Sequence, residues 1–67
     1  MKKELIEKIN SFIPIYRNFF DAIEFLNEKG KLTAIEYIFL KLGCRCKTED
    51  IVLKKLMYFR KELIIND

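Results

Sequence analysis

The sequence predicts an all-α fold, a compact single domain of about four short helices whose C-terminal half has the outline of a helix-turn-helix. Three observations predict it. Apolar residues recur at helical spacing along most of the chain, and no β-hairpin pattern occurs. Pro14, Gly30 and Gly43 divide the apolar stretches from one another. A chain of 67 residues has room for one domain only, so residues 1–67 are expected to form it.

The first two helices are predicted over residues 3–12 and 14–29. Proline ends the first helix because it lacks a backbone N–H. The expected apolar face of the second helix consists of Ile15, Tyr16, Phe19, Phe20, Ile23 and Leu26. Phe25 falls among the polar residues of the opposite face and is therefore expected to be exposed. Gly30 is expected to end this helix because glycine adopts a positive φ without a steric clash.

The third helix has the clearest start signal in the chain. Thr33 and Glu36 match a capping box, in which each side chain accepts a hydrogen bond from the backbone N–H of the other residue. Residues 34–42 are apolar on all sides except at Glu36 and Lys41, which predicts a central, buried helix that ends at Gly43.

The fourth helix is predicted over residues 49–63, with Thr48 as its N-cap. One apolar stripe, which would face the core, consists of Val52, Leu56, Phe59 and Leu63. A second stripe, about 100° away around the helix, consists of Leu53, Met57 and Ile64. One helix of a small domain rarely needs both stripes for its core, so the second is expected to be available to a partner.

Cys44 and Cys46 lie in the basic link between the last two helices. Their spacing is too short for an ordinary structural disulfide. A structural zinc site needs four ligands, whereas this chain has two cysteines and no histidine, so we expect no metal and no cofactor. The main interpretation is a plain connection. Two alternatives stay open: a metal site shared by two chains, and a redox role favoured by the charges of Arg45 and Lys47.

The residue inventory predicts a protein without catalytic residues. Histidine, the commonest general base near neutral pH, is absent, and no nucleophile triad or glycine-rich phosphate loop occurs. No apolar run approaches the roughly 18 residues of a membrane span, so no membrane partner is expected. Without a targeting segment, and with reduced thiols, a cytoplasmic location is expected. The bias toward Lys, Ile, Leu, Phe and Glu is typical of an A/T-rich genome, such as that of a phage or another mobile element.

Charge is distributed unevenly along the chain. Residues 1–30 carry five basic and five acidic side chains, whereas residues 31–61 carry eight basic and three acidic ones. The predicted basic surface consists of Lys41, Arg45, Lys47, Lys54 and Lys61. Together with the helix-turn-helix outline, it favours one of two hypotheses, a homodimeric DNA-binding transcriptional regulator. Glu49 and Asp50 weaken this hypothesis because they would face phosphates at the start of the recognition helix.

The surplus of apolar residues favours the other hypothesis, a protein-interaction module. Such residues make up 51% of the chain, although a domain of this size buries only a marginal core. The predicted partner-binding residues are Phe25, Tyr37, Leu40, Leu53, Met57 and Ile64. The function expected first is a small non-enzymatic regulator or inhibitor that docks on a protein, either itself as a homodimer or another chain. Its binding surface would be apolar and helical, with a basic rim.

Overall fold

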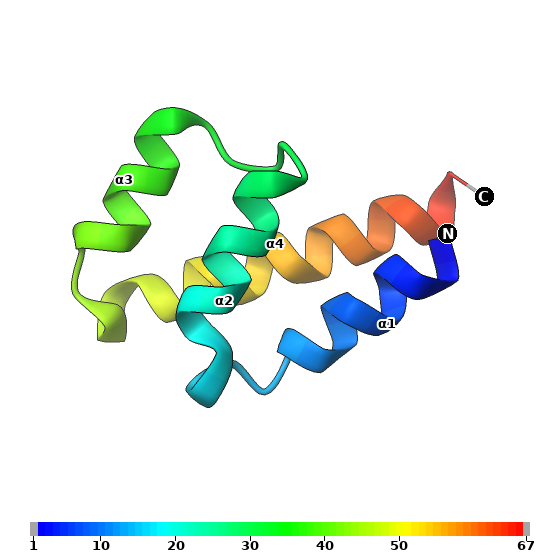
Figure 1. Cartoon of the computed structure of the whole chain (residues 1–67), viewed down its shortest axis with the longest axis horizontal. Helices are drawn as coiled ribbons and strands as arrows, with labels where there is room; N and C mark the ends of the chain where they lie inside the picture. Colours follow the sequence, from blue (N-terminus) through cyan, green and yellow to red (C-terminus); the bar gives the residue numbers. More distant parts are fainter. Residues whose placement is uncertain (1, 67) are drawn as a thin grey trace.

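Four helices follow one another in a computed structural model that describes residues 2–66, apart from the side chains of residues 15–17 (Figure 1). They are α1 (Lys2–Phe12), α2 (Ile15–Glu28), α3 (Ala34–Leu42) and α4 (Arg45–Ile65). The predicted all-α fold of four helices is confirmed. The predicted side chains of Ile15 and Tyr16 on the apolar face of α2 lie outside the described part of the structure.

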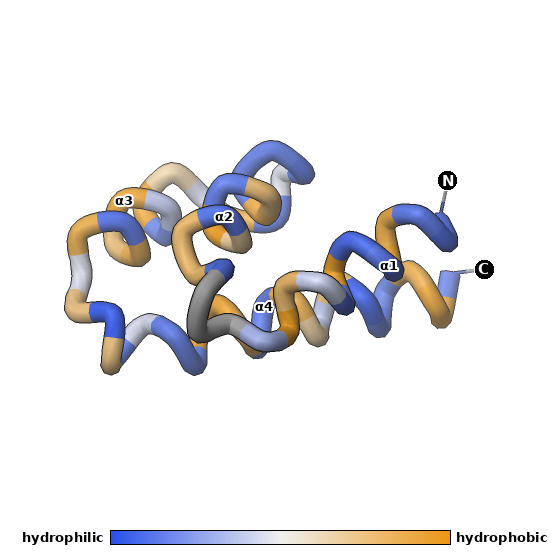
Figure 2. The backbone as a smooth tube through the Cα atoms, turned by 60° about the horizontal axis from the view of Figure 1, so that its bottom comes forward, coloured by the Kyte–Doolittle hydropathy of each residue, from blue (hydrophilic) through white to orange (hydrophobic). Residues whose placement is uncertain are grey.

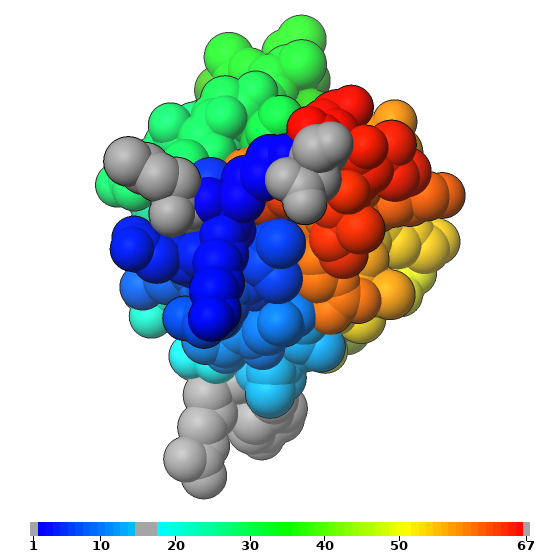
Figure 3. Space-filling view, turned by 90° about the vertical axis from the view of Figure 1, so that its right-hand side faces the viewer, coloured from blue at the N-terminus to red at the C-terminus, as the bar shows by residue number. Residues whose placement is uncertain are grey.

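The longest helix, α4, extends along much of the molecule and contacts the other three helices. The molecule measures 35 × 23 × 15 Å along its principal axes, and α3 lies at one end of the long axis (Figure 1). At the other end α1 lies beside the C-terminal half of α4, as the adjoining blue and red surfaces in Figure 3 show. The structure thus places α2 and α4 at the centre and α3 at the edge, and the prediction of a central third helix is wrong.

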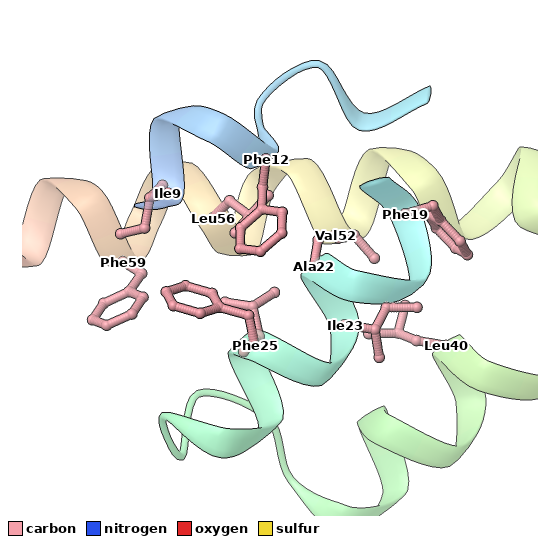
Figure 4. Packing of buried hydrophobic residues seen from close by; sticks show 11 residues of the cluster. Ile9, Phe12, Phe19, Ala22, Ile23, Phe25, Leu40, Val52, Leu56 and Phe59 are labelled. Carbon is pink, nitrogen blue, oxygen red and sulfur yellow. The ribbon is translucent and has the colours of Figure 1, made fainter. Parts of the chain in front are cut away.

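The core lies where α1, α2 and α4 meet. Three rings join these helices, because Phe25 of α2 lies 5.1 Å from Phe12 of α1 and 6.0 Å from Phe59 of α4, measured between ring centroids (Figure 4). The buried apolar residues are Ile9, Phe12, Phe19, Ala22, Ile23, Phe25, Leu26, Leu40, Val52, Leu56 and Phe59. The prediction that Phe25 is exposed is therefore wrong. α2 has α1 and α4 packed against it, so it buries more of its circumference than one stripe.

Local signals end α2 and begin α3 as predicted. Gly30 adopts a φ of 69°, the Lys31 N–H donates to the Leu26 carbonyl at 2.9 Å, and the Gly30 N–H donates to the Asn27 carbonyl at 3.1 Å. These are the two hydrogen bonds of a Schellman motif. After Thr33, the capping box is complete: Thr33 Oγ1 accepts from the Glu36 N–H at 3.1 Å, and Glu36 Oε1 accepts from the Thr33 N–H at 2.9 Å.

The start of α4 differs from the prediction. The helix begins at Arg45 with Cys44 as its N-cap, so Thr48 is not a capping residue. Thr48 lies inside the helix and is buried, and its hydroxyl donates to the Cys44 carbonyl at 3.1 Å. Its methyl group also lies close to Gly43, the C-cap of α3. A buried threonine whose hydroxyl donates to the carbonyl four residues before it can lie in a helix interior. The helix α4 thus begins four residues before its predicted start at residue 49.

Candidate interaction surface

Helix α3 presents its apolar side to solvent. Ile35, Ile38, Phe39 and Leu42 are 80%, 55%, 56% and 83% exposed, respectively. Their spacing of three, four and seven residues from Ile35 places them on one side of a helix. We call these four residues the outer face of α3. Much of α3 is coloured as hydrophobic residues in Figure 2, although only Leu40 of this helix is fully buried.

The inward side of α3 is held largely by polar contacts. The Tyr37 hydroxyl donates a hydrogen bond to the Glu24 carboxylate of α2, and Lys41 Nζ lies 2.9 Å from the same Glu24 oxygen. On the other flank, Glu36 Oε2 lies 2.8 Å from Lys55 Nζ of α4. These contacts and the burial of Leu40 orient the helix. The usual polarity of a surface helix is therefore reversed, with ion pairs toward the protein and large apolar side chains toward water.

The polar contacts also shift the ionisation of the groups involved. Hydrogen bonds from Tyr37, and then from Lys41, hold the pKa of Glu24 below its usual value. The same carboxylate raises the pKa of Tyr37 and the pKa of Lys41. Lys55, followed by the Thr33 backbone N–H, lowers the pKa of Glu36. Each shift favours the charge state that holds α3 in its observed orientation.

Two further apolar side chains lie beside α3. Phe20 of α2 is 53% exposed, and Lys41 Nζ of α3 lies 6.0 Å from its ring centroid. Ile51 of α4 is partly exposed and lies one turn before Lys55, which pairs with α3. Both helices that contact α3 thus carry an exposed apolar side chain of their own. Monomeric proteins rarely leave large apolar patches in water unless they bind something.

The six residues predicted to bind a partner do not form one surface. Phe25 and Leu40 are buried, so they are unavailable to a partner and their assignment is wrong. Tyr37 is half-buried, and its hydroxyl bonds Glu24. Met57 and Ile64 are exposed and line a shallow hollow on α4, and Leu53 of the same predicted stripe is half-buried.

The outer face of α3 was missed at the sequence level, although its signal is present. The outer face has the spacing with which a helix inserts apolar anchors into the groove of a partner, at Ile35, Ile38, Phe39 and Leu42. Because Leu40 and Tyr37 fill the opposite side of the same helix, the segment looks apolar all round, which is typical of a buried helix. The side that faces the protein is shown by the burial of Leu40 and by the partners of Glu36, Tyr37 and Lys41, which lie on other helices.

Most of the predicted basic surface is compensated by nearby carboxylates. The pairs are Lys41 with Glu24 (2.9 Å), Arg45 with Glu49 (3.1 Å) and Lys54 with Asp50 (3.3 Å). Within the part of the chain that the structure describes, Lys47 and Lys61 form no ion pair. The positive potential of residues 31–61 is therefore weaker than the residue count implies, because each nearby carboxylate offsets one basic charge.

Two exposed thiols lie at the start of α4, Cys44 as its N-cap and Cys46 in its first turn. The sulfur atoms of Cys44 and Cys46 are 2.7 Å apart. The Arg45 side chain between them contacts Glu49 and Phe19. Its Nε lies 3.1 Å from Glu49 Oε2, and its Cζ lies 5.0 Å from the Phe19 ring centroid.

Other signs of function are few. Within residues 2–66, no group of three or more His, Cys, Asp or Glu side chains is arranged to hold a metal ion. None of the described helices combines the length and apolar character needed to cross a membrane. No protein-family model, curated protein or solved structure matches this chain. A functional assignment therefore rests on the chain's own surface geometry.

Proposed function

We propose that this protein is a small non-enzymatic regulator or inhibitor that docks on a protein partner through the outer face of α3. The observation that carries this proposal is the reversed polarity of that helix. Ile35, Ile38, Phe39 and Leu42 have the spacing with which amphipathic helices insert anchors into an apolar groove. The structure leaves all four in water.

Energetics support this assignment over a chance exposure. Full burial of one such side chain contributes roughly 1.5–3 kcal/mol. A helix that served only the core would turn these side chains inward. Instead, α3 buries Leu40 on its opposite side and pairs with Glu24 and Lys55 there, so the four outer residues face solvent.

A second copy of this chain is the first partner to test. The charged groups next to the outer face are compensated, because Lys41 pairs with Glu24 and Glu36 pairs with Lys55. Two copies could therefore bring their α3 helices together about a twofold axis without repulsion between like charges. A domain of 67 residues also gains stability from association, since its own core is small. The uncompensated Lys47 would form part of a basic rim, which affects association rate more than affinity.

The runner-up is a homodimeric helix-turn-helix DNA-binding regulator, and a specific feature favours it. Gly43 and Cys44 join α3 to a long helix whose exposed side carries Lys47 and Lys61 without ion-pair partners in the described chain. The compensation of Arg45 and Lys54 counts against it.

The decisive experiment compares wild type with two charge insertions. Ile38→Glu places a charge in the outer face of α3, and Ile65→Glu places one at a comparably exposed position near the C-terminal end of α4. Sedimentation equilibrium over a range of concentrations reports self-association, and urea unfolding reports folding. We expect Ile38→Glu to abolish association without loss of folding and Ile65→Glu to leave it unchanged, because only Ile38 lies in the proposed interface.

If wild type is monomeric throughout, the same three proteins are tested against partners captured from the source cell and then purified. Loss of binding only in Ile38→Glu supports heterologous docking. Equal binding by both variants, or no partner sensitive to Ile38, contradicts the proposal. DNA binding is titrated in parallel at two salt concentrations. Binding that weakens with salt, and is lost in Lys47→Ala with Lys61→Ala but kept in Ile38→Glu, would favour the runner-up.

A further inference from the structure

The two thiols at the start of α4 form a pair outside the proposed docking surface. Cys44 precedes the helix as its N-cap and Cys46 lies in its first turn. Their sulfur atoms are in contact at 2.7 Å, and both residues are exposed to small reagents in solvent. Neither thiol belongs to the core, and neither is needed for any packing described above. A contact between two accessible sulfurs is the geometry that thiol–disulfide chemistry requires.

The two thiols are not equivalent. The hydrogen bond from the Cys46 thiol, and then the nearby backbone N–H groups of Cys46 and Lys47, lower the pKa of Cys44. The Cys44 side chain makes no capping hydrogen bond, and its contact with the Cys46 thiol is the main cause of the lowered pKa. The pKa of Cys46 is raised by the same partner. Cys44 is thus the better nucleophile, and Cys46 is the neighbouring thiol that keeps its proton.

We infer that Cys44 and Cys46 form a peroxide-reactive dithiol that is oxidised to a disulfide within one chain. The Cys44 thiolate attacks one oxygen of a hydroperoxide and breaks the O–O bond. This gives a Cys44 sulfenic acid, and the leaving oxygen takes a proton as water or an alcohol. Cys46 sulfur then attacks Cys44 sulfur and displaces its hydroxide, which leaves as water with the Cys46 proton. The two thiols supply the two electrons that reduce the peroxide.

The resulting disulfide would be readily reduced. One intervening residue closes a small ring, which departs from the geometry of unstrained disulfides. Strained, exposed disulfides have more oxidising potentials than structural ones, so a small thiol returns them to the reduced state. This property accounts for a cysteine spacing that is unsuited to a structural disulfide, and it makes the modification reversible.

The test uses full-length wild type, Cys44→Ser and Cys46→Ser with hydrogen peroxide as the probe. Serine is a good N-cap and both positions are exposed, so both variants should fold, which circular dichroism checks. Samples are taken over time, denatured, alkylated and weighed by mass spectrometry. We expect wild type to lose both alkylation sites together, to remain one chain, and to recover both sites with dithiothreitol.

The single variants distinguish the two roles. Cys46→Ser should stop at a sulfenic acid that dimedone captures. Its reaction should be faster than that of Cys44→Ser, because the backbone N–H groups of Cys46 and Lys47 lower the pKa of Cys44 and are still present in Cys46→Ser. Equal rates for the two variants would overturn the assignment of Cys44 as nucleophile. Disulfides formed only between chains, irreversible sulfinic acid, or no reaction of the folded wild type would overturn the dithiol itself.

Discussion

Tyr37 of α3 donates a hydrogen bond to Glu24 of α2, and this contact fixes the side of α3 that faces the protein. Lys41, one turn further along α3, lies 2.9 Å from the same carboxylate oxygen. One carboxylate therefore holds two side chains of the neighbouring helix. The exposure of Ile38 and Phe39 on the far side of α3 follows from this arrangement.

Acid should weaken the fold through this carboxylate. The pKa of Glu24 is lower in the folded chain than in the unfolded one, chiefly because Tyr37 and then Lys41 donate hydrogen bonds to it. Its stabilisation is complete above the usual value of 4.5 and is lost as pH falls through the lowered folded value. Urea midpoints measured between pH 7 and pH 2 should therefore fall less in Glu24→Gln than in wild type. The urea midpoint of Tyr37→Phe, which keeps the ring but not the hydroxyl, should fall by an intermediate amount. Parallel curves for all three proteins would contradict the assigned role of Glu24.

High pH should weaken the same contact, in this case by removing protons from Tyr37 and Lys41. Glu24 raises the pKa of both Tyr37 and Lys41 in the folded chain. Their contribution to stability is present below the unfolded values and is lost as pH rises through the higher folded values. The midpoint of wild type should thus decline above about pH 10. The decline should be smaller in Tyr37→Phe, which has no phenol to ionise, and an unchanged alkaline profile would count against the contact.

The capping box of α3 should be measurable in isolation. Thr33→Ala removes the oxygen that accepts the Glu36 N–H and should lower the free energy of unfolding by about 1 kcal/mol. Thr33→Ser keeps that oxygen and is the matched control. Urea unfolding at neutral pH gives both values. If alanine and serine have equal midpoints, the cap does not stabilise the helix.

Substitution of Gly30 or Gly43 by alanine should lower stability for different reasons. At Gly30 an added Cβ meets no atom within 4 Å, but the φ of 69° disfavours L-residues, so Gly30→Ala should cost about 1 kcal/mol. At Gly43 the backbone is extended, yet a Cβ would lie 2.7 Å from the Phe39 carbonyl oxygen and 3.1 Å from Thr48 Cγ2. Gly43→Ala should therefore cost more.

Gly30→Asn is the control, because asparagine tolerates the left-handed conformation. It should restore part of the stability lost in Gly30→Ala, as measured by thermal or urea unfolding. The reverse order, with Gly30→Ala as the most damaging of the three variants, would show that the close approach at Gly43 relaxes easily.

Phe25 and Met57 were both predicted to bind a partner, but their different burial should give their alanine variants different unfolding free energies. Phe25 is 7% exposed between Phe12 and Phe59, so Phe25→Ala should lower the unfolding free energy by about 3–5 kcal/mol. Met57 is 46% exposed, and Met57→Ala should change it by less than about 0.5 kcal/mol. Equal losses in urea unfolding would place Phe25 outside the core.

The sequence predicts features that depend on neighbouring residues and misses those that depend on packing between helices. The Thr33–Glu36 cap and the Gly30 turn are confirmed because their partners lie within five residues along the chain. Phe25 was misplaced because helical period alone cannot show that two helices flank α2. Similarly, the orientation of α3 depends on contacts between residues 13 and 17 positions apart, which no local pattern reveals.

The sequence predicted the type of candidate site but not the residues that form it. A surplus of apolar residues predicts an interaction surface, but not its location. Leu40 and Ile38 are equally apolar in the sequence, and only the packing of α3 makes one buried and the other exposed. The same holds for the basic surface. The sequence predicted both Lys54 and Lys61 to belong to it, yet within the described residues only Lys54 has a carboxylate partner, Asp50.

The Lys2 ammonium donates to the Asn66 carbonyl at 2.7 Å, so the two ends of the chain meet at the end of the molecule farthest from α3 (Figure 1). An affinity tag, a fluorophore or a surface linkage attached at either terminus would therefore stand well away from Ile35 and Leu42. A sensor chip carrying the protein by either end would present α3 to the solution. The neighbouring ends also suit joining by a short linker, so that new termini could be opened at an exposed turn such as Gly30.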